Sequence, residues 1–179
     1  MENSASLPPS NLPIIVLMGV SGSGKTTVGT VIAAQAGMVF ADGDDFHSTV
    51  NKQKMAAGTP LTDADREPWL QALNAVLVAW WRAGRGGVLA CSALRESYRK
   101  ALAAGMPAGT VHFVLLEAPR ELIAARLAAR AHEYMNPRLL DSQLATLEAE
   151  EDGYSIANDR APALVAAEIL NHLRLQQAS

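Results

Sequence analysis

Cysteine, aromatic side chains and long apolar runs are all scarce in this chain of 179 residues. The single cysteine, Cys91, excludes an internal disulfide and fits a reducing, cytoplasmic compartment. No apolar run approaches the roughly 20 residues that a membrane-spanning helix needs. The net charge is −3, so no excess of positive charge favours binding to nucleic acid or to an anionic membrane. We therefore expect a globular protein with no nucleic-acid and no membrane partner.

Two parts of very different length are predicted along the chain. Residues 1–13 are polar and rich in serine and proline. They have neither the basic segment nor the apolar core of a signal peptide, so we expect a flexible N-terminal tail. Residues 14–179 have the length of one domain, and the hydrophobic content of 49% over the chain is typical of globular proteins. Because no repeat or interdomain linker is visible, a single domain over 14–179 is predicted.

The most informative stretch is a glycine-rich segment over residues 19–26 that fits the pattern G-x-x-x-x-G-K-[ST] of phosphate-binding loops. An unbroken apolar run precedes it at residues 14–18, as expected for a strand buried on both faces of a parallel sheet. Residues 27–34 have the pattern of a helix start, which completes the strand, loop and helix that the motif requires. The residues predicted to bind nucleotide phosphates here are Gly19, Val20, Ser21, Gly22, Ser23, Gly24, Lys25, Thr26 and Thr27.

Each residue type in this loop suits phosphate chemistry. Glycines let the backbone turn its N–H groups inward as a nest for anionic oxygens. The following helix adds its unpaired N–H groups and the positive end of its dipole. Lys25 is predicted to be a mobile positive charge for the β- and γ-phosphates, and the Thr26 hydroxyl is predicted to ligate Mg²⁺. The alternative is a plain Gly/Ser-rich turn, which rarely has Gly, Lys and Thr in this register.

Short apolar runs alternate with helical patterns along the rest of the chain. Residues 48–62 are an exception, because they are mixed and turn-rich. A helix is expected after Thr62, whose spacing to Asp65 resembles a capping box, with Pro68 tolerated only in a first turn. This alternation predicts an α/β fold with a five-stranded parallel sheet and helices on both of its faces. The predicted strands cover residues 14–18, 38–41, 88–91, 111–116 and 155–157.

Three carboxylates directly follow the second predicted strand: Asp42, Asp44 and Asp45. Ligands of open α/β sheets bind at the carboxyl ends of the strands, so these acids fall where a phosphate-bound metal and an acceptor would lie. Asp42 and Asp44 are expected to point the same way, because strand side chains alternate with a period of two. The acids could instead cap the following turn, and which of the three is a base stays open.

Together these motifs resemble the gluconate kinases (gluconokinases), small P-loop kinases related to shikimate and nucleoside monophosphate kinases. The resemblance covers nearly the whole chain after residue 13. The specific segments are Asp42-Gly43-Asp44-x-x-His47, Asn51, Lys54-Met55-x-x-Gly58-x-Pro60-Leu61-x-Asp63-x-Asp65-Arg66-x-Pro68-Trp69-Leu70, Cys91-Ser92-Ala93-Leu94, Tyr98-Arg99, Ser142-Gln143 and Thr146-Leu147-Glu148.

The resemblance implies a cytoplasmic enzyme of gluconate utilisation that transfers a phosphoryl group from ATP to D-gluconate, with Mg²⁺, and forms 6-phospho-D-gluconate. It also implies a three-layer P-loop NTPase fold with a helical lid. Family members are often dimers, which leaves a homodimer open. The alternatives are another small-acceptor kinase, such as a shikimate kinase, or a nucleotide-switched protein without turnover. The paired acids and an arginine-bearing lid favour the enzyme.

The resemblance also implies roles for residues around the acceptor. Asp44 would orient and deprotonate the acceptor hydroxyl, and Asp42 would hold Mg²⁺ through water. Arg66 is the best candidate for the sugar-acid carboxylate, because a guanidinium can bind it in a bidentate manner, although a surface ion pair is the alternative. Arg99 has the same two interpretations with weaker support. His47 is expected to contact substrate hydroxyls.

The lid is predicted around residues 131–138, where the helical pattern breaks. Arg130 at its base would be a cation for the transferring phosphate, and Arg126, one turn earlier, would be a nucleotide-binding or structural residue. The family usually has Arg, two residues, His and an aromatic here. In this chain His132 comes one place early and Glu133 stands in the histidine position, so the resemblance assigns His132 no role.

Overall fold

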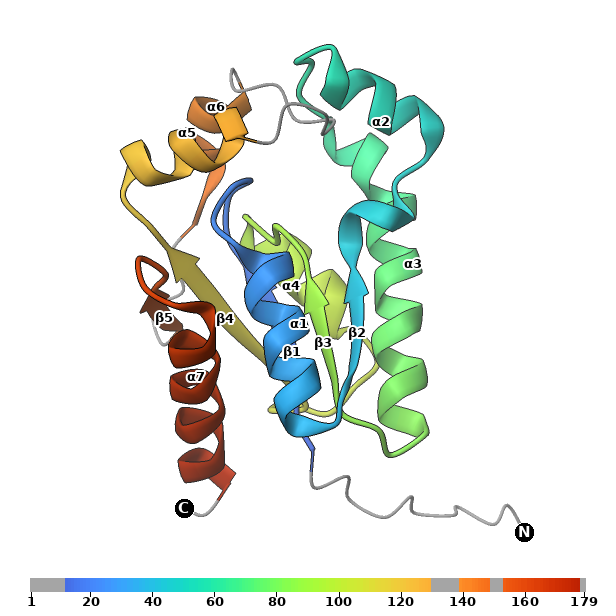
Figure 1. Ribbon diagram of the computed structural model, residues 1–179. Coiled ribbons are helices and arrows are strands. Elements are labelled where there is room, and N and C mark those ends of the chain that lie inside the picture. Colours follow the sequence, from blue (N-terminus) through green and yellow to red (C-terminus); the bar gives the residue numbers. More distant parts are fainter. Residues whose placement is uncertain (1–11, 130–138, 149–152, 178–179) are drawn as a thin grey trace, which may run out of the picture.

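The computed structural model describes residues 12–129, 139–148 and 153–177, which contain a five-stranded parallel sheet with strand order β2-β3-β1-β4-β5 (Figure 1). The strands are β1 (Ile14–Met18), β2 (Val39–Asp42), β3 (Gly87–Ala90), β4 (Val111–Glu117) and β5 (Tyr154–Ala157). The helices are α1 (Lys25–Ala36), the 3₁₀ turn η1 (Gly43–Phe46), α2 (Thr49–Ala56), α3 (Asp63–Arg82), α4 (Glu96–Ala103), α5 (Arg120–Ala129), α6 (Leu139–Thr146) and α7 (Pro162–Gln177).

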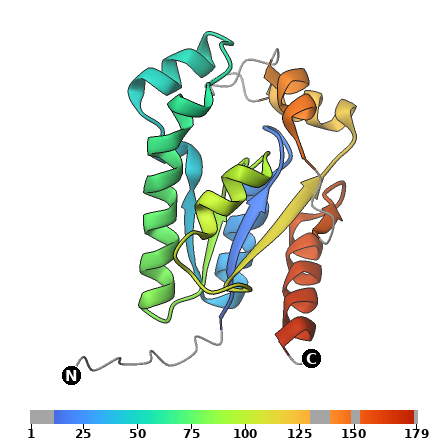
Figure 2. The same cartoon turned by 180° about the vertical axis from the view of Figure 1, so that it is seen from behind.

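The central strand β1 divides the core into two halves. Its alternating side chains enter opposite halves, because successive strand residues point to opposite faces. Ile15 and Leu17 pack in the half covered by α1 and α7, whereas Ile14, Val16 and Met18 pack in the half covered by α3 and α4. Figures 1 and 2 show these two helix layers on opposite faces of the sheet. The predicted three-layer α/β fold is confirmed.

The strand order determines where a ligand can bind. β1 pairs with β3 on one side and with β4 on the other, so the loop after β1 lies at the centre of one edge of the sheet. The ends of β2 and β3 reach the same edge, with Asp42 opposite Ala90 in the β2–β3 register. Helices α2, α5 and α6 lie beyond this edge (Figure 1). The glycine loop and the carboxylates after β2 are therefore neighbours in space.

Two local predictions around residues 48–68 were wrong. Residues 49–56 form helix α2, which begins after the Ser48 cap and is held by a bond from Asn51 Nδ2 to the carbonyl of Asp65. Pro68 lies in the second turn of α3, although the predicted capping box of Thr62 and Asp65 is present. Burial of the next residues in α3 against the sheet compensates for the helical bond that proline cannot donate.

The described part of the chain leaves some predictions without a structural counterpart. Residues 1–11 of the predicted tail and residues 130–138 of the predicted lid lie outside the described residues. The division into a tail and a domain over 14–179 stays a prediction. Within the described residues, no helix combines the length and the apolar character needed to cross a bilayer.

Candidate active site

The glycine loop has a backbone that only glycine adopts easily. The φ angles of Gly19, Gly22 and Gly24 are 137°, 80° and 97°, in or near the left-handed region that disfavours a Cβ. Space is also limiting, because a Cβ on Gly24 would lie 2.2 Å from Nδ2 of Asn158. The glycines of the motif are therefore required both by conformation and by packing.

Lys25 begins α1 directly after this loop. Its Nζ donates to the carbonyl oxygens of Gly19 and Val20, both at 3.0 Å, so the ammonium lies across the loop. The first turn of α1 has no acidic residue that would neutralise the positive end of the helix dipole. The loop amides, the ammonium and the helix terminus together form a positively polarised site for phosphate.

The loop is held from outside by two residues far away in the sequence. The carbonyl of the fully buried Ser23 accepts from Asn158 Nδ2 at 2.7 Å and from Arg126 at 3.4 Å. Arg126 also donates to the carbonyl of Asn158 at 2.8 Å. These contacts favour the structural alternative for Arg126. Asn158 has no motif that would have identified it, because it simply follows the last strand.

Thr26 and Asp42 come together at the end of β2. Thr26 Oγ1 donates to Asp42 Oδ2 at 2.6 Å, and Asp42 Oδ1 accepts from the backbone N–H of Asp44 at 3.0 Å. A hydroxyl and a carboxylate exposed at the sheet edge are the hard oxygen donors that Mg²⁺ prefers. Within the described residues, no three His, Cys, Asp or Glu side chains cluster as a metal site. The pair fits a metal that is coordinated largely by water and phosphate.

A pocket opens beside the loop and brings several predicted residues together. Its wall includes Lys25, Asp44, His47, Arg66, Trp69 and Gln143. Asp42 caps η1 through its bond to the Asp44 amide, and this turn places Asp44 in the pocket wall. Asp42 therefore caps the turn, which was the alternative considered for these acids, and also lies beside Thr26.

His47 is a neutral residue in this wall. Its ring stacks on Trp69 with the ring centroids 4.3 Å apart, and Trp69 Nε1 donates to the carbonyl of Gly43 at 2.7 Å. Burial, together with the positive charges of Arg66 and Lys52, lowers the pKa of His47 to about 4. Within the described residues its Nδ1 has no hydrogen-bond partner. Because Nδ1 is buried, a ligand hydroxyl would have to meet the other ring nitrogen, Nε2.

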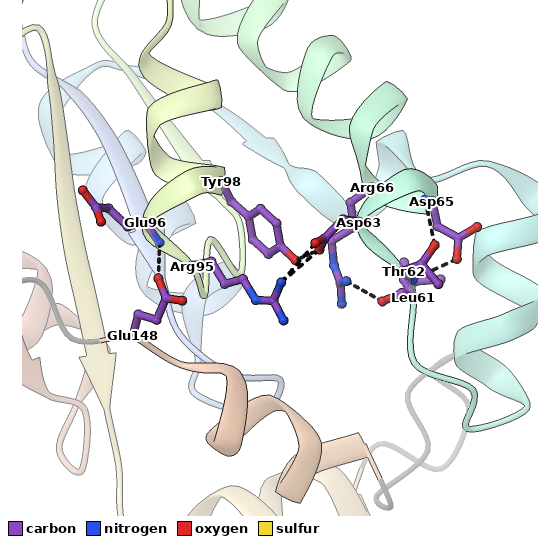
Figure 3. Close-up of polar contacts among 9 residues, drawn as sticks. All are labelled: Leu61, Thr62, Asp63, Asp65, Arg66, Arg95, Glu96, Tyr98 and Glu148. Carbon is purple, nitrogen blue, oxygen red and sulfur yellow. Dashed lines mark hydrogen bonds and ion pairs between the residues drawn. The ribbon is translucent and has the colours of Figure 1, made fainter.

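Arg66 lies in the pocket wall with neutral partners. Its guanidinium donates to the carbonyl of Leu61 and lies over the ring of Tyr98, 5.4 Å from the centroid. Among the described residues it forms no ion pair with an acid, so the surface ion pair considered above is not present. The nearby acid Asp63 is instead bound by Tyr98 and Arg95 (Figure 3).

Of the remaining predicted arginines, Arg99 does not reach this wall, and Arg130 is not among the described residues. Arg99 is only 3% exposed, donates to the carbonyl of Ala93 at 3.1 Å and does not line the pocket. Ala93 has a φ of 42°, so Arg99 supports a strained turn after β3. Arg130 lies outside the described residues, as do His132 and Glu133, and its role stays a prediction.

Helix α6 and the residues just after it contribute three contacts that the sequence did not predict. Gln143 Oε1 accepts from the backbone N–H of Ser21 at 2.7 Å, across 122 residues. Just after α6, the carboxylate of Glu148 accepts from the Glu96 N–H at 2.7 Å (Figure 3). The backbone N–H of Glu148 donates to the carbonyl of Leu94 at 2.8 Å. Gln143 and Glu148 belong to the segments that carry the resemblance, which was their only signal.

The chain is similar in sequence and in structure to proteins named as kinases. A family model described as an AAA domain matches residues 14–150. The chain is 41% identical to the gluconokinase of Gluconobacter oxydans (strain 621H) over 90% of this chain and 92% of that protein. It is similar to the structure of a sugar kinase from Janibacter sp. HTCC2649, with a TM-score of 0.82 and 42% identity over 91% of this chain and 95% of that one. A gluconokinase structure from Sinorhizobium meliloti 1021 has a TM-score of 0.79 and 38% identity, over 92% and 93% of the two chains.

Proposed function

Because the chain belongs to the gluconokinase family of small P-loop kinases, we propose that it transfers the γ-phosphoryl group of ATP to D-gluconate and forms 6-phospho-D-gluconate and ADP. One observation carries this assignment beyond family membership. Lys25, Asp44 and Arg66 line the same pocket, which combines a cation for phosphate, a carboxylate and a cation for an acidic acceptor. These are the three charges that phosphorylation of a sugar acid needs.

The glycine loop and α1 bind the phosphoryl donor in this proposal. Phosphoryl transfer needs positioning and charge stabilisation more than covalent help from the protein. The loop amides and Lys25 hold the β- and γ-phosphates in line with the acceptor. Thr26 would hold Mg²⁺ through its hydroxyl oxygen and Asp42 would hold it through water, and the metal would neutralise phosphate charge. Asn158 keeps the loop in the shape that this binding requires.

The acceptor lies in the pocket with its two ends bound by opposite charges. Arg66 binds the carboxylate of gluconate, and His47 forms hydrogen bonds with hydroxyl groups along the chain. Asp44 accepts the proton of the terminal hydroxyl as its oxygen bonds to the γ-phosphorus and the bond to ADP breaks. Arg130 as a further cation at the phosphate, and a homodimer, stay predictions of the resemblance.

Phosphorylation of a substrate panel with labelled ATP tests this function. We expect Mg²⁺-dependent transfer to D-gluconate in preference to other sugar acids and to shikimate. Transfer to shikimate instead would favour the alternative kinase, and nucleotide binding without any transfer would favour a nucleotide-switched protein.

Arg66→Gln tests the carboxylate role directly. Charge-assisted hydrogen bonds contribute enough that we expect the KM for gluconate to rise roughly 10- to 100-fold, with little change in the KM for ATP. Arg82→Gln, at the far end of α3 and about 24 Å along the helix axis, is the matched control. An unchanged KM for gluconate in folded Arg66→Gln would contradict the role.

A further inference from the structure

We propose that Tyr98 is a positioning residue that holds Asp63 away from Arg66 and so keeps the Arg66 guanidinium available for the acceptor carboxylate. This inference rests on the proposed function, because it assumes that Arg66 binds the carboxylate. Tyr98 belongs to the segments that carry the family resemblance, yet neither the motifs nor the pocket wall assign it a role.

Asp63 and Arg66 are natural partners for one another. Residues three apart on a helix surface are neighbours, and an Asp and an Arg at this spacing attract each other. Both lie in the first turns of α3. An ion pair between them would occupy the guanidinium with an internal carboxylate, which would then compete with the carboxylate of a substrate.

In the structure, Asp63 is bound by Tyr98 and Arg95 and not by Arg66. The Tyr98 hydroxyl donates to Asp63 Oδ1 at 2.5 Å, and the Arg95 guanidinium donates to both carboxylate oxygens at 3.1 and 3.2 Å. Figure 3 shows both donors reaching Asp63 from α4 and the loop before it. The carboxylate of Asp63 is therefore satisfied by partners on another element.

Tyr98 is the fixed member of this contact, and Asp63 is the adaptable one. The tyrosine is 5% exposed and packs in the core half shared by α3 and α4, whereas the Asp63 side chain is 68% exposed. Burial and the bond to Asp63 raise the pKa of Tyr98, so its hydroxyl stays a donor at neutral pH. An exposed aspartate without this anchor could rotate toward the next turn of its own helix.

The same tyrosine also supports Arg66 without neutralising it. The Arg66 guanidinium lies over the Tyr98 ring, and its other partner is the carbonyl of Leu61. Both contacts are with neutral groups, which orient a guanidinium but leave its charge for a ligand. Tyr98 therefore acts twice, through its hydroxyl on the acid and through its ring on the arginine.

Tyr98→Phe separates these two actions, because it keeps the ring and removes the hydroxyl. We expect the KM for gluconate to rise about three- to tenfold, the size of one typical net hydrogen bond, because Arg95 still binds Asp63, with kcat and the KM for ATP unchanged. Adding Asp63→Asn removes the competing carboxylate, so the double variant should return to within about twofold of the parent KM. Tyr154→Phe, on the edge strand β5, is the control for loss of a tyrosine hydroxyl elsewhere.

The outcomes distinguish this inference from the function on which it rests. If Arg66→Gln leaves the KM for gluconate unchanged, the carboxylate role and the inference both fail. If Arg66→Gln raises that KM but Tyr98→Phe does not, only the inference is wrong. A rise in Tyr98→Phe that Asp63→Asn does not reverse would also overturn it, because the effect would then not pass through Asp63.

Arg95→Gln gives a second route to the same contact should Tyr98→Phe fail to fold. Arg95 is on the surface, with 40% of its side chain exposed, so its replacement leaves the core unchanged. We expect a rise of about two- to threefold in the KM for gluconate, again reversed by Asp63→Asn. No change in Arg95→Gln together with an unfolded Tyr98→Phe would refute the inference.

Discussion

The two walls of the active site are made of different parts of the protein chain. The nucleotide wall is one continuous segment, residues 19–26, whose groups are mostly backbone atoms around left-handed glycines. The acceptor wall gathers side chains from separate elements, with Asp44 from η1, Arg66 from α3 and Gln143 from α6. The first wall has a shape that a short motif encodes, whereas the second exists only once the chain has folded.

This difference explains how one fold can serve several acceptors. Backbone amides bind phosphate whatever the acceptor is, so the nucleotide wall can stay constant. Side chains such as Asp44 and Arg66 can be replaced without rebuilding the loop, because each comes from its own element, whereas Gln143 also contacts the loop through the Ser21 N–H. We therefore expect substitutions in the acceptor wall to change turnover or acceptor affinity, and substitutions in the nucleotide wall to change nucleotide binding and stability as well.

The largest expected effect tests the acceptor wall. Asp44→Asn is nearly isosteric but cannot accept the proton of the hydroxyl, and general-base catalysis typically contributes about 10²–10⁴-fold. We expect kcat to fall within that range while nucleotide binding, measured by calorimetry, is retained. Asp45→Asn is the control on the same turn. If Asp42→Asn lowered kcat strongly and Asp44→Asn left kcat unchanged, the roles of the two acids would be exchanged.

Lys25→Ala removes the one charged side chain that the nucleotide wall contributes to the phosphates. Loss of a comparable preorganised charge costs about 3–4 kcal/mol in the transition state, so turnover should fall by roughly 10²–10³-fold while the fold survives. Steady-state kinetics would measure turnover, and circular dichroism would show whether the fold survives. Lys100→Ala, in an exposed ion pair with Glu96, is the control. Near-normal turnover in folded Lys25→Ala would refute its role.

Gly24→Ala tests the claim that the nucleotide wall is built from backbone. The left-handed conformation costs about 1–2 kcal/mol with a Cβ, and displacement of Asn158 should cost about 1–3 kcal/mol more. We expect a loss of about 2–5 kcal/mol in the free energy of unfolding and weaker nucleotide binding. Gly37→Ala has a similar φ of 65° but no neighbour within 4 Å, so it should show only the conformational cost. Equal losses in both variants would contradict the packing role.

The smallest expected effect concerns pH and the acceptor wall. The pKa of His47 is about 4 in the folded protein and about 6.5 in the unfolded chain, so between these two pH values the proton binds mainly to the unfolded chain. Stability should therefore fall as the pH drops from about 6.5 to 4, by about 2 kcal/mol from this group at pH 5. Denaturant unfolding of the parent and of His47→Gln at pH 6.5 and at pH 5 measures this loss in the free energy of unfolding. An equally steep loss in His47→Gln would assign the pH dependence to other groups.

Much of the fold could be predicted from the sequence because its signals are local. The five strands are apolar runs, the glycine loop is contiguous, and the cap of α3 spans only Thr62 to Asp65. Helix α2 was missed because its anchor is tertiary, a bond from Asn51 to the carbonyl of Asp65 in the next helix. The weak apolar pattern of α2 gave no local sign of that partner.

The sequence by itself determined the phosphate loop, the parallel sheet and the set of candidate residues, since each depends on neighbours along the chain. Only the tertiary structure decided which candidates meet. Arg66 faces the pocket while Arg99 is buried beneath Ala93, although both are arginines of the same resemblance. Asn158 reaches Ser23 across 135 residues, and Gln143 reaches Ser21 across 122. Contacts at such separation have no local pattern, because packing of the whole domain brings their partners together.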